Sequence, residues 1–286
     1  MARTVLVPLD GSELAEQALV QVRPLVDRLG LEVALLTCVP PAEDESGAAP
    51  SADAAREYLA EVTRRALGPS VRSTARVATG DPASEILDEI ARRPPYLVAL
   101  TTHGRSGIAR WIRGSVAQRL LRRSPAPLLV CRPFEDASEG DHGPFRRILV
   151  PLDGSERANR ILPLVQDVAR SYGSRVVLLR VARRLDAAQH DPPITPDGLA
   201  RSLHDARARL ESAQVEVEAR GRFGDAAAEV VACADEHAVD LIAMSTHGRT
   251  GLRRWLFGSV AEHVFDECRA PLLVQRSTDL AGGEAG

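Results

Sequence analysis

The chain has 286 residues, of which 44% are hydrophobic and 26% are charged, and its formal net charge is -3 at pH 7. This length suits one large domain or two of ordinary size, and the slightly acidic balance argues against a general nucleic-acid-binding protein. The chain has no apolar run of about eighteen residues that could span a membrane, so we expect neither nucleic acid nor a membrane among its partners.

The lysine and cysteine content of the chain limits the reactions and ligands that can be expected. All 36 basic residues are arginines, so lysine-dependent chemistry is excluded. The four cysteines are far apart and form no C-x-x-C pair, which is typical of small buried side chains in a reducing compartment. The first residues lead straight into an apolar run and lack the layout of a signal peptide. We therefore expect a cytoplasmic protein.

The first half of the chain alternates between two kinds of pattern. Short apolar runs predict buried strands at residues 3–9, 32–39, 71–78, 96–100 and 127–131. Helical spacing, cap residues and turn residues predict helices between them, over about 13–29, 53–67, 82–92 and 114–123. Such alternation predicts an α/β domain whose five-stranded, mostly parallel sheet carries helices on both faces.

The second half repeats the first. The eight residues from Leu149 to Glu156 match those from Leu6 to Glu13 letter for letter, and 16 of 29 positions are identical between 102–130 and 246–274. The chain is therefore an internal duplication. We predict two tandem domains, at 1–133 and 146–276, joined by a linker at 134–145 and followed by a flexible tail at 277–286.

A glycine-rich loop follows the fourth predicted strand of each half. Its glycines let the backbone approach a ligand closely, and the Gly-Ser-Val that ends the loop opens a helix whose free N–H groups favour an anion. The spacing therefore predicts a phosphate site in each half, although a tight turn that only joins strand to helix is the alternative. The residues concerned are Gly104, Gly107, Gly114, Ser115 and Val116, and then Gly248, Gly251, Gly258, Ser259 and Val260.

An aspartate ends the first strand of each half, at Asp10 and Asp153. Ligands of open α/β sheets bind beyond the carboxyl ends of the strands, where a carboxylate suits a ribose hydroxyl, a base amine or Mg²⁺. The alternative is an ordinary helix N-cap, formed together with Ser12 or Ser155. The loop histidines His103 and His247 have no nucleophile in a triad-like setting, so we interpret them as residues that orient the loop.

The repeated motifs resemble those of the universal stress protein family in its tandem two-domain form. They are Val-Leu-Val-Pro-Leu-Asp-Gly-Ser, Gly-Asp-Pro, and Thr-His-Gly-Arg-Ser-Gly followed by Gly-Ser-Val-Ala. The resemblance implies two Rossmann-like domains. The ATP-binding branch of the family carries a G-x2-G-x9-G-[ST] loop, which falls here on Gly104 and Gly114-Ser115, and again on Gly248 and Gly258-Ser259. The first glycine of that loop is replaced in both halves, by Thr101 and Ser245.

The resemblance implies that each half binds ATP, with Mg²⁺ carried by the nucleotide. Asp10 and Asp153 would contact the nucleoside or the metal, and the backbone of Val39 and Val181 would meet the adenine edge. We expect a cytoplasmic sensor or regulator of a stress response rather than an enzyme, because no lysine and no evident base would support fast hydrolysis; slow hydrolysis is left open.

Two other functions compete with this interpretation. The double replacement at Thr101 and Ser245 is compatible with an interaction protein that binds no nucleotide. A nucleotide-dependent or NAD-linked enzyme on a similar sheet is disfavoured, because no G-x-G-x-x-G follows the first strand. In every case we expect the two halves to pack about a pseudo-two-fold axis, with the terminal strands 127–131 and 271–275 as the meeting edges. A homodimer of the whole chain and its protein partners are left open.

Overall fold

The computed structural model describes residues 3–41, 51–101, 115–132, 145–183, 195–247 and 258–277. The first half contains β1 (Thr4–Leu9), α1 (Glu13–Leu29), β2 (Glu32–Val39), α2 (Ala52–Val62), η1 (Thr63–Leu67), β3 (Ser73–Thr79), α3 (Pro82–Arg92), β4 (Leu97–Thr101), α4 (Ser115–Arg123) and β5 (Leu128–Cys131). The second half contains β6 (Arg147–Pro151), α5 (Glu156–Asn159), α6 (Leu162–Tyr172), β7 (Arg175–Ala182), α8 (Pro196–Arg201), α9 (His204–Ser212), β8 (Glu216–Phe223), α10 (Ala226–Glu236), β9 (Leu241–His247), α11 (Ser259–Glu267) and β10 (Leu272–Ser277).

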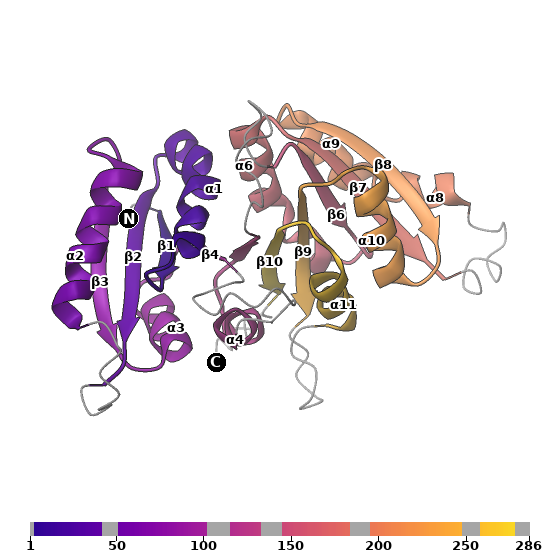
Figure 1. Ribbon diagram of the computed structural model, residues 1–286. Coiled ribbons are helices and arrows are strands. Elements are labelled where there is room, and N and C mark those ends of the chain that lie inside the picture. Colours follow the sequence, from indigo (N-terminus) through magenta and orange to yellow (C-terminus); the bar gives the residue numbers. More distant parts are fainter. Residues whose placement is uncertain are drawn as a thin grey trace, which may run out of the picture.

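The strands form one ten-stranded sheet in the order β3-β2-β1-β4-β5-β10-β9-β6-β7-β8 (Figure 1). Within each half the neighbouring strands are parallel. The two halves meet where β5 and β10 pair antiparallel. The predicted α/β class, with a mostly parallel sheet in each half, is confirmed, and so are the predicted meeting edges.

Helices cover both faces of this sheet because its strands are apolar on both sides. One hydrophobic core lies between the sheet and the helices α1, α2, α6 and α9. A second core lies on the opposite face, under α3, α4, α10 and α11. All four residues of β5 are buried, as expected of a strand with neighbours on both sides and helices on both faces.

Helix ends follow the chemistry of the residues that form them. The hydroxyl of Ser12 accepts a hydrogen bond from the amide of Ala15 at the start of α1, and the carboxylate of Asp81 accepts one from Ser84 at the start of α3. Gly30 ends α1 in the left-handed conformation, with φ of 61°. These signals are visible in the sequence, and the corresponding helix boundaries lie where the sequence predicts them.

Two helical segments differ from what the spacing of their apolar residues indicates. The helix expected over 53–67 ends its regular part at Val62, and a single π-helical turn completes it to Leu67, where Thr63 Oγ1 donates to the carbonyl of Leu59. The helical pattern between Leu199 and Leu210 forms two helices, α8 and α9, instead of one. Leu199 of α8 and Leu203, which lies between the two helices, are both buried.

The two halves are also joined on the face that carries α1 and α6, which pack against each other (Figure 1). Gln21 of α1 is fully buried there, and the hydroxyl of Tyr172 donates to its carbonyl at 2.5 Å. The hydroxyl of Tyr96 donates to Asp167 of α6 at 2.6 Å, while Arg3 stacks on the ring of Tyr96. The junction therefore combines strand pairing, helix packing and polar contacts.

None of the helices in the described parts of the chain is long and apolar enough to cross a membrane.

Candidate functional site

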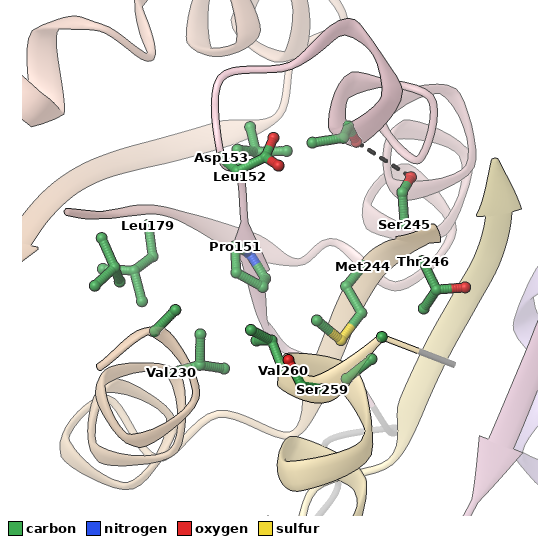
Figure 2. Close-up of a pocket in the computed structure, with 15 residues that line it drawn as sticks. Pro151, Leu152, Asp153, Leu179, Val230, Met244, Ser245, Thr246, Ser259 and Val260 are labelled. Carbon is green, nitrogen blue, oxygen red and sulfur yellow. Dashed lines mark hydrogen bonds between the residues drawn. The ribbon is translucent and has the colours of Figure 1, made fainter. Parts of the chain in front are cut away.

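A pocket of about 240 Å³ opens at the carboxyl edge of the second half (Figure 2). The ends of β6, β7 and β9 and the first turns of α10 and α11 form its walls. The residues that line it are Pro151, Leu152, Asp153, Ala158, Leu179, Val181, Ala226, Val230, Met244, Ser245, Thr246, Gly258, Ser259, Val260 and Ala261. The structure thus brings together, in one pocket, the sequence-predicted residues Asp153, Val181, Gly258, Ser259 and Val260.

Asp153 lies at the mouth of the pocket, in the turn between β6 and α5. Its Oδ1 accepts a hydrogen bond from the amide of Ser155 at 2.9 Å, and Ser155 Oγ caps α5 by accepting from the amide of Ala158 at 3.1 Å. The helix-cap interpretation is therefore correct for the serine, and the aspartate holds the cap in place. A carboxylate has two oxygens with several acceptor positions, so this role does not exhaust its capacity for hydrogen bonds.

The first half repeats this turn. Asp10 is exposed, and its Oδ1 accepts from both the amide and the hydroxyl of Ser12, at 3.0 and 2.6 Å. Ser12 in turn caps α1. Both aspartates therefore occupy the same place at the carboxyl edge of their own half-sheet, which is where the sequence predicts them.

The N-terminus of α11 forms the wall of the pocket opposite β7, and no side chain of the described residues caps it. By contrast, a serine or aspartate side chain caps α1, α3, α5 and α10, which begin at the same kind of edge. The first amides of α11 therefore differ from those of α1, α3, α5 and α10 in having no side-chain cap within the described chain. Such amides attract an anion, and the helix dipole adds to the attraction.

Gly258 precedes α11 with φ of 53° and ψ of 127°, a backbone conformation that residues other than glycine rarely adopt. A Cβ atom at this position would have open space around it. The glycine is therefore required by the backbone conformation and not by crowding. Ser259 is exposed and Val260 is half-buried at the start of the helix, and Ser115 and Val116 have the same exposures at the start of α4.

The remaining predicted loop residues lie outside the described parts of the chain. They are His103, Gly104, Gly107, Gly114, Gly248 and Gly251, and the side chain of His247 is not described either.

The sheet register shows that the predicted residues Val39 and Val181 are not equivalent positions of the two halves. Pro8 lies opposite Leu36 in the first half, and Pro151 lies opposite Leu179 in the second. Val39 and Ala182 therefore correspond, because each lies three residues beyond these leucines. Val181 lies only two residues beyond Leu179 and corresponds to Cys38. The carbonyls of Val39 and Ala182 behave alike, since each accepts from the amide of the glycine that ends the next strand, Gly80 or Gly224. An apolar run does not fix its own register, which is why the sequence pairs Val39 with Val181.

Sequence reasoning missed the apolar wall of the pocket. Leu179, Val230 and Met244 line it from β7, α10 and β9, and Figure 2 shows their side chains around the same space. The signal was present as alternating apolar positions in two strands, but alternation does not say which face carries a pocket. Ser245, at the position of the replaced loop glycine, donates through Oγ to the carbonyl of Ala158 at 3.2 Å and so ties β9 to α5.

The described residues contain no group of three or more His, Cys, Asp or Glu side chains that could hold a metal ion on its own. A Mg²⁺ ion at Asp153 would therefore need ligands from a bound molecule such as a nucleotide. The four cysteines are free thiols, three of them buried, as expected for apolar packing residues. Burial, and then the charge of the nearby Glu85, raise the pKa of the Cys38 thiol to about 11.

The pattern of residues matches the model of the universal stress protein family twice, over residues 1–132 and 144–276. A universal stress protein of Mycobacterium tuberculosis is 30% identical over 193 residues, which span 64% of this chain and 62% of the relative. Another, from Methanocaldococcus jannaschii, is 28% identical over 152 residues, 46% of this chain and 94% of that protein. A solved universal stress protein from Archaeoglobus fulgidus shares the fold, with a TM-score of 0.72 at 20% identity, covering 96% of this chain and 98% of the other.

Proposed function

The chain belongs to the universal stress protein family, and we propose that it binds one ATP molecule in each of its two halves and acts as a cytoplasmic regulator of a stress response. One observation carries the proposal. Asp153, Val181 and the Gly258–Val260 segment were singled out from sequence as nucleotide contacts, and they line one pocket at the carboxyl edge of the sheet. Ligands of open α/β sheets bind at that edge.

The pocket divides into an apolar and a polar side that suit the parts of a nucleotide. Leu179, Val181 and Met244 offer an apolar surface on which a purine ring can lie. The carboxylate of Asp153 can accept a hydrogen bond from a ribose hydroxyl or help to hold a nucleotide-bound Mg²⁺. The uncapped amides at Ser259 and Val260 can bind a phosphate.

The same residues support regulation better than catalysis. The chain has no lysine to neutralise charge on a transferring phosphoryl group, and the pocket contains no histidine, and no carboxylate other than Asp153, among its described lining residues. Asp153 is already bonded to the turn that begins α5. We therefore propose that the protein acts by binding and releasing a nucleotide, and that this changes its shape or its partner.

The direct test is calorimetric titration of the purified full chain with ATP and GTP, after release and mass analysis of any bound molecule. We expect ATP to bind more tightly than GTP, because the adenine edge is proposed to meet backbone groups at Val39 and near Val181. Asp153→Asn should weaken ATP binding at one of two sites. Asp27→Asn is the matched control, since Asp27 is an exposed partner of Arg23 on α1 and should leave binding unchanged. Absence of binding to any nucleotide would favour the interaction-protein alternative.

A further inference from the structure

Arg276 is a half-buried arginine that the proposed function does not use. It follows the apolar part of β10, and its Nε atom is buried without a hydrogen-bond partner among the described residues. Burial lowers the pKa of its guanidinium group, and no carboxylate of the described chain offsets that effect. A buried polar atom of this kind is uncommon in folded proteins, so a physical reason for it should be sought.

The duplicated half shows what such an arginine does when it has partners. Arg132, 144 positions earlier, is the corresponding residue of the first half and directly follows β5. Its Nη2 donates to the carbonyl of Phe265 at 2.9 Å and its Nε to the carbonyl of Ala270 at 3.3 Å, so that it holds the C-terminal end of α11. Its guanidinium also lies near the ring of Phe265. Arg132 is therefore committed to the junction between the halves.

The residues that surround the two arginines differ between the halves. The counterpart of Ala270 is Ala126, whose carbonyl already accepts a hydrogen bond from Ser124 Oγ at 2.9 Å. The second half has Cys268 at the position of Ser124, and a thiol is a much weaker donor. The surroundings of the two arginines therefore differ at this position of the repeat.

The position of Arg276 relates it to the pocket. Arg276 lies opposite Thr246 in the parallel pair of β10 and β9, and Thr246 lines the pocket. Leu272 and Val274 of β10 belong to the same core as Met244 of β9, so alternation places Arg276 on the pocket face as well. Figure 2 shows Thr246 on the side of the pocket next to β10. Neighbouring strands are only about 4.8 Å apart, which is less than the length of an extended arginine side chain.

The order of the strands bears on which part of a nucleotide each wall of the pocket would contact. Across the carboxyl edge the strands run β7, β6, β9 and β10. Leu179 of the apolar wall is on β7, Asp153 follows β6, and Arg276 is on β10, at the opposite end of this strand order from Leu179. A nucleotide that lies across this edge, with its first phosphates at the start of α11, directs its last phosphate toward β10.

Building on the proposed function, we propose that Arg276 binds the terminal phosphates of a nucleotide in the second half, so that this half distinguishes ATP from AMP more strongly than the first half does. A guanidinium group binds phosphate oxygens bidentately and stays charged when partly desolvated. In the first half Arg132 cannot play this part, because it already bonds to two carbonyls. The two sites of one chain therefore differ in the ligand they select.

The test is a calorimetric titration of Arg276→Gln with ATP and with AMP. ATP affinity at one of the two sites should fall about tenfold to a hundredfold, the usual effect of losing a hydrogen bond to a charged group. AMP affinity should not change, and Arg276→Lys should restore part of the loss. In a Gly258→Asp background, which blocks the second site, Arg276→Gln should have no effect. Arg132→Gln should lower the melting temperature and leave the ratio of ATP to AMP affinity unchanged.

Three results would overturn the inference, and they are distinguishable. If Arg276→Gln binds ATP as tightly as the wild type, the side chain does not contact the ligand, while the proposed function stands. If it loses ATP and AMP affinity equally, Arg276 has a structural role only. If the wild type binds no nucleotide at all, the proposed function fails and this inference fails with it.

Discussion

Leu129 of β5 and Leu273 of β10 lie directly opposite each other in the antiparallel pair that joins the two halves. They are the same position of the duplicated sequence, 144 residues apart. The two flanking pairs are Leu128 with Val274 and Val130 with Leu272. A shift by 144 residues between the halves converts one of these pairs into the other. A local two-fold axis therefore passes between Leu129 and Leu273. The chain retains in one molecule the kind of self-complementary contact that joins two identical subunits.

The polar part of this junction depends on Tyr96. Tyr96→Phe removes the hydroxyl that donates to Asp167 of the other half at 2.6 Å. We expect the free energy of unfolding to fall by about 1 to 2 kcal/mol, the lower part of the usual range for a charged acceptor because the contact is partly exposed. Asp167→Asn keeps an acceptor oxygen and should cost less. Denaturant unfolding of the three proteins measures this, and equal midpoints would show that the contact does not stabilise the junction.

Gly221 should be a sensitive position on the edge strand β8. A Cβ atom there would lie 2.0 Å from the carbonyl oxygen of Pro196 and 2.7 Å from the Cβ of Leu199, so α8 would have to move away from the strand. We expect Gly221→Ala to lower the free energy of unfolding by roughly 1 to 3 kcal/mol, as overpacking usually does. Gly30→Ala is the comparison. A Cβ atom at position 30 has free space but the backbone has a positive φ, so this variant should lose stability through backbone strain alone. A stability gain in Gly221→Ala would contradict the close packing of α8.

Cys38 should react slowly with alkylating reagents at neutral pH. Burial, and then the charge of Glu85, raise the pKa of this thiol to about 11, and only the thiolate reacts. The alkylation rate should therefore keep rising with pH above about 10, where an ordinary cysteine with a pKa of about 8.5 has levelled off. Glu85→Gln should lower the pKa and increase the rate at pH 9. A rate profile with its midpoint near pH 8.5 in the wild type would show that the thiol is not protected.

The sequence predicted the fold well because the signals that define it are local or repeated. Buried apolar runs, the caps at Ser12 and Asp81, and the left-handed Gly30 each specify structure within a few residues. The duplication added a second copy of each signal and pointed to the pairing of the terminal strands. The break between α8 and α9 was missed because the helical spacing of apolar residues continues across it, while tertiary packing decides where the helix stops.

The candidate site was predictable in part. Asp153 and the Gly258–Val260 segment were found because a carboxylate at a strand end and a glycine before a helix recur at the same spacing in both halves. The correspondence of Val39 with Ala182 was missed, because a uniform apolar strand is equally consistent with neighbouring registers. Arg276 could not be singled out from sequence at all. Its significance depends on the burial of its Nε atom without a partner among the described residues, which only the folded chain reveals.

The central claim is that each half holds one adenine nucleotide at the helix that follows its glycine-rich loop, and nucleotide stoichiometry tests it most directly. Gly258→Asp places a carboxylate at the uncapped start of α11, where it repels phosphate. Because Gly258 has a φ of 53°, any side chain there also strains the backbone. Gly258→Ala carries that strain without the charge and is the matched control. Gly114→Asp makes the corresponding change in the first half.

Calorimetric titration with ATP should give about two sites for the wild type and for Gly258→Ala, about one for Gly258→Asp and for Gly114→Asp, and none for the double aspartate variant. Circular dichroism should show all of them folded. Two sites in a folded Gly258→Asp protein would contradict the account, because the pocket at the start of α11 would then not be the phosphate site.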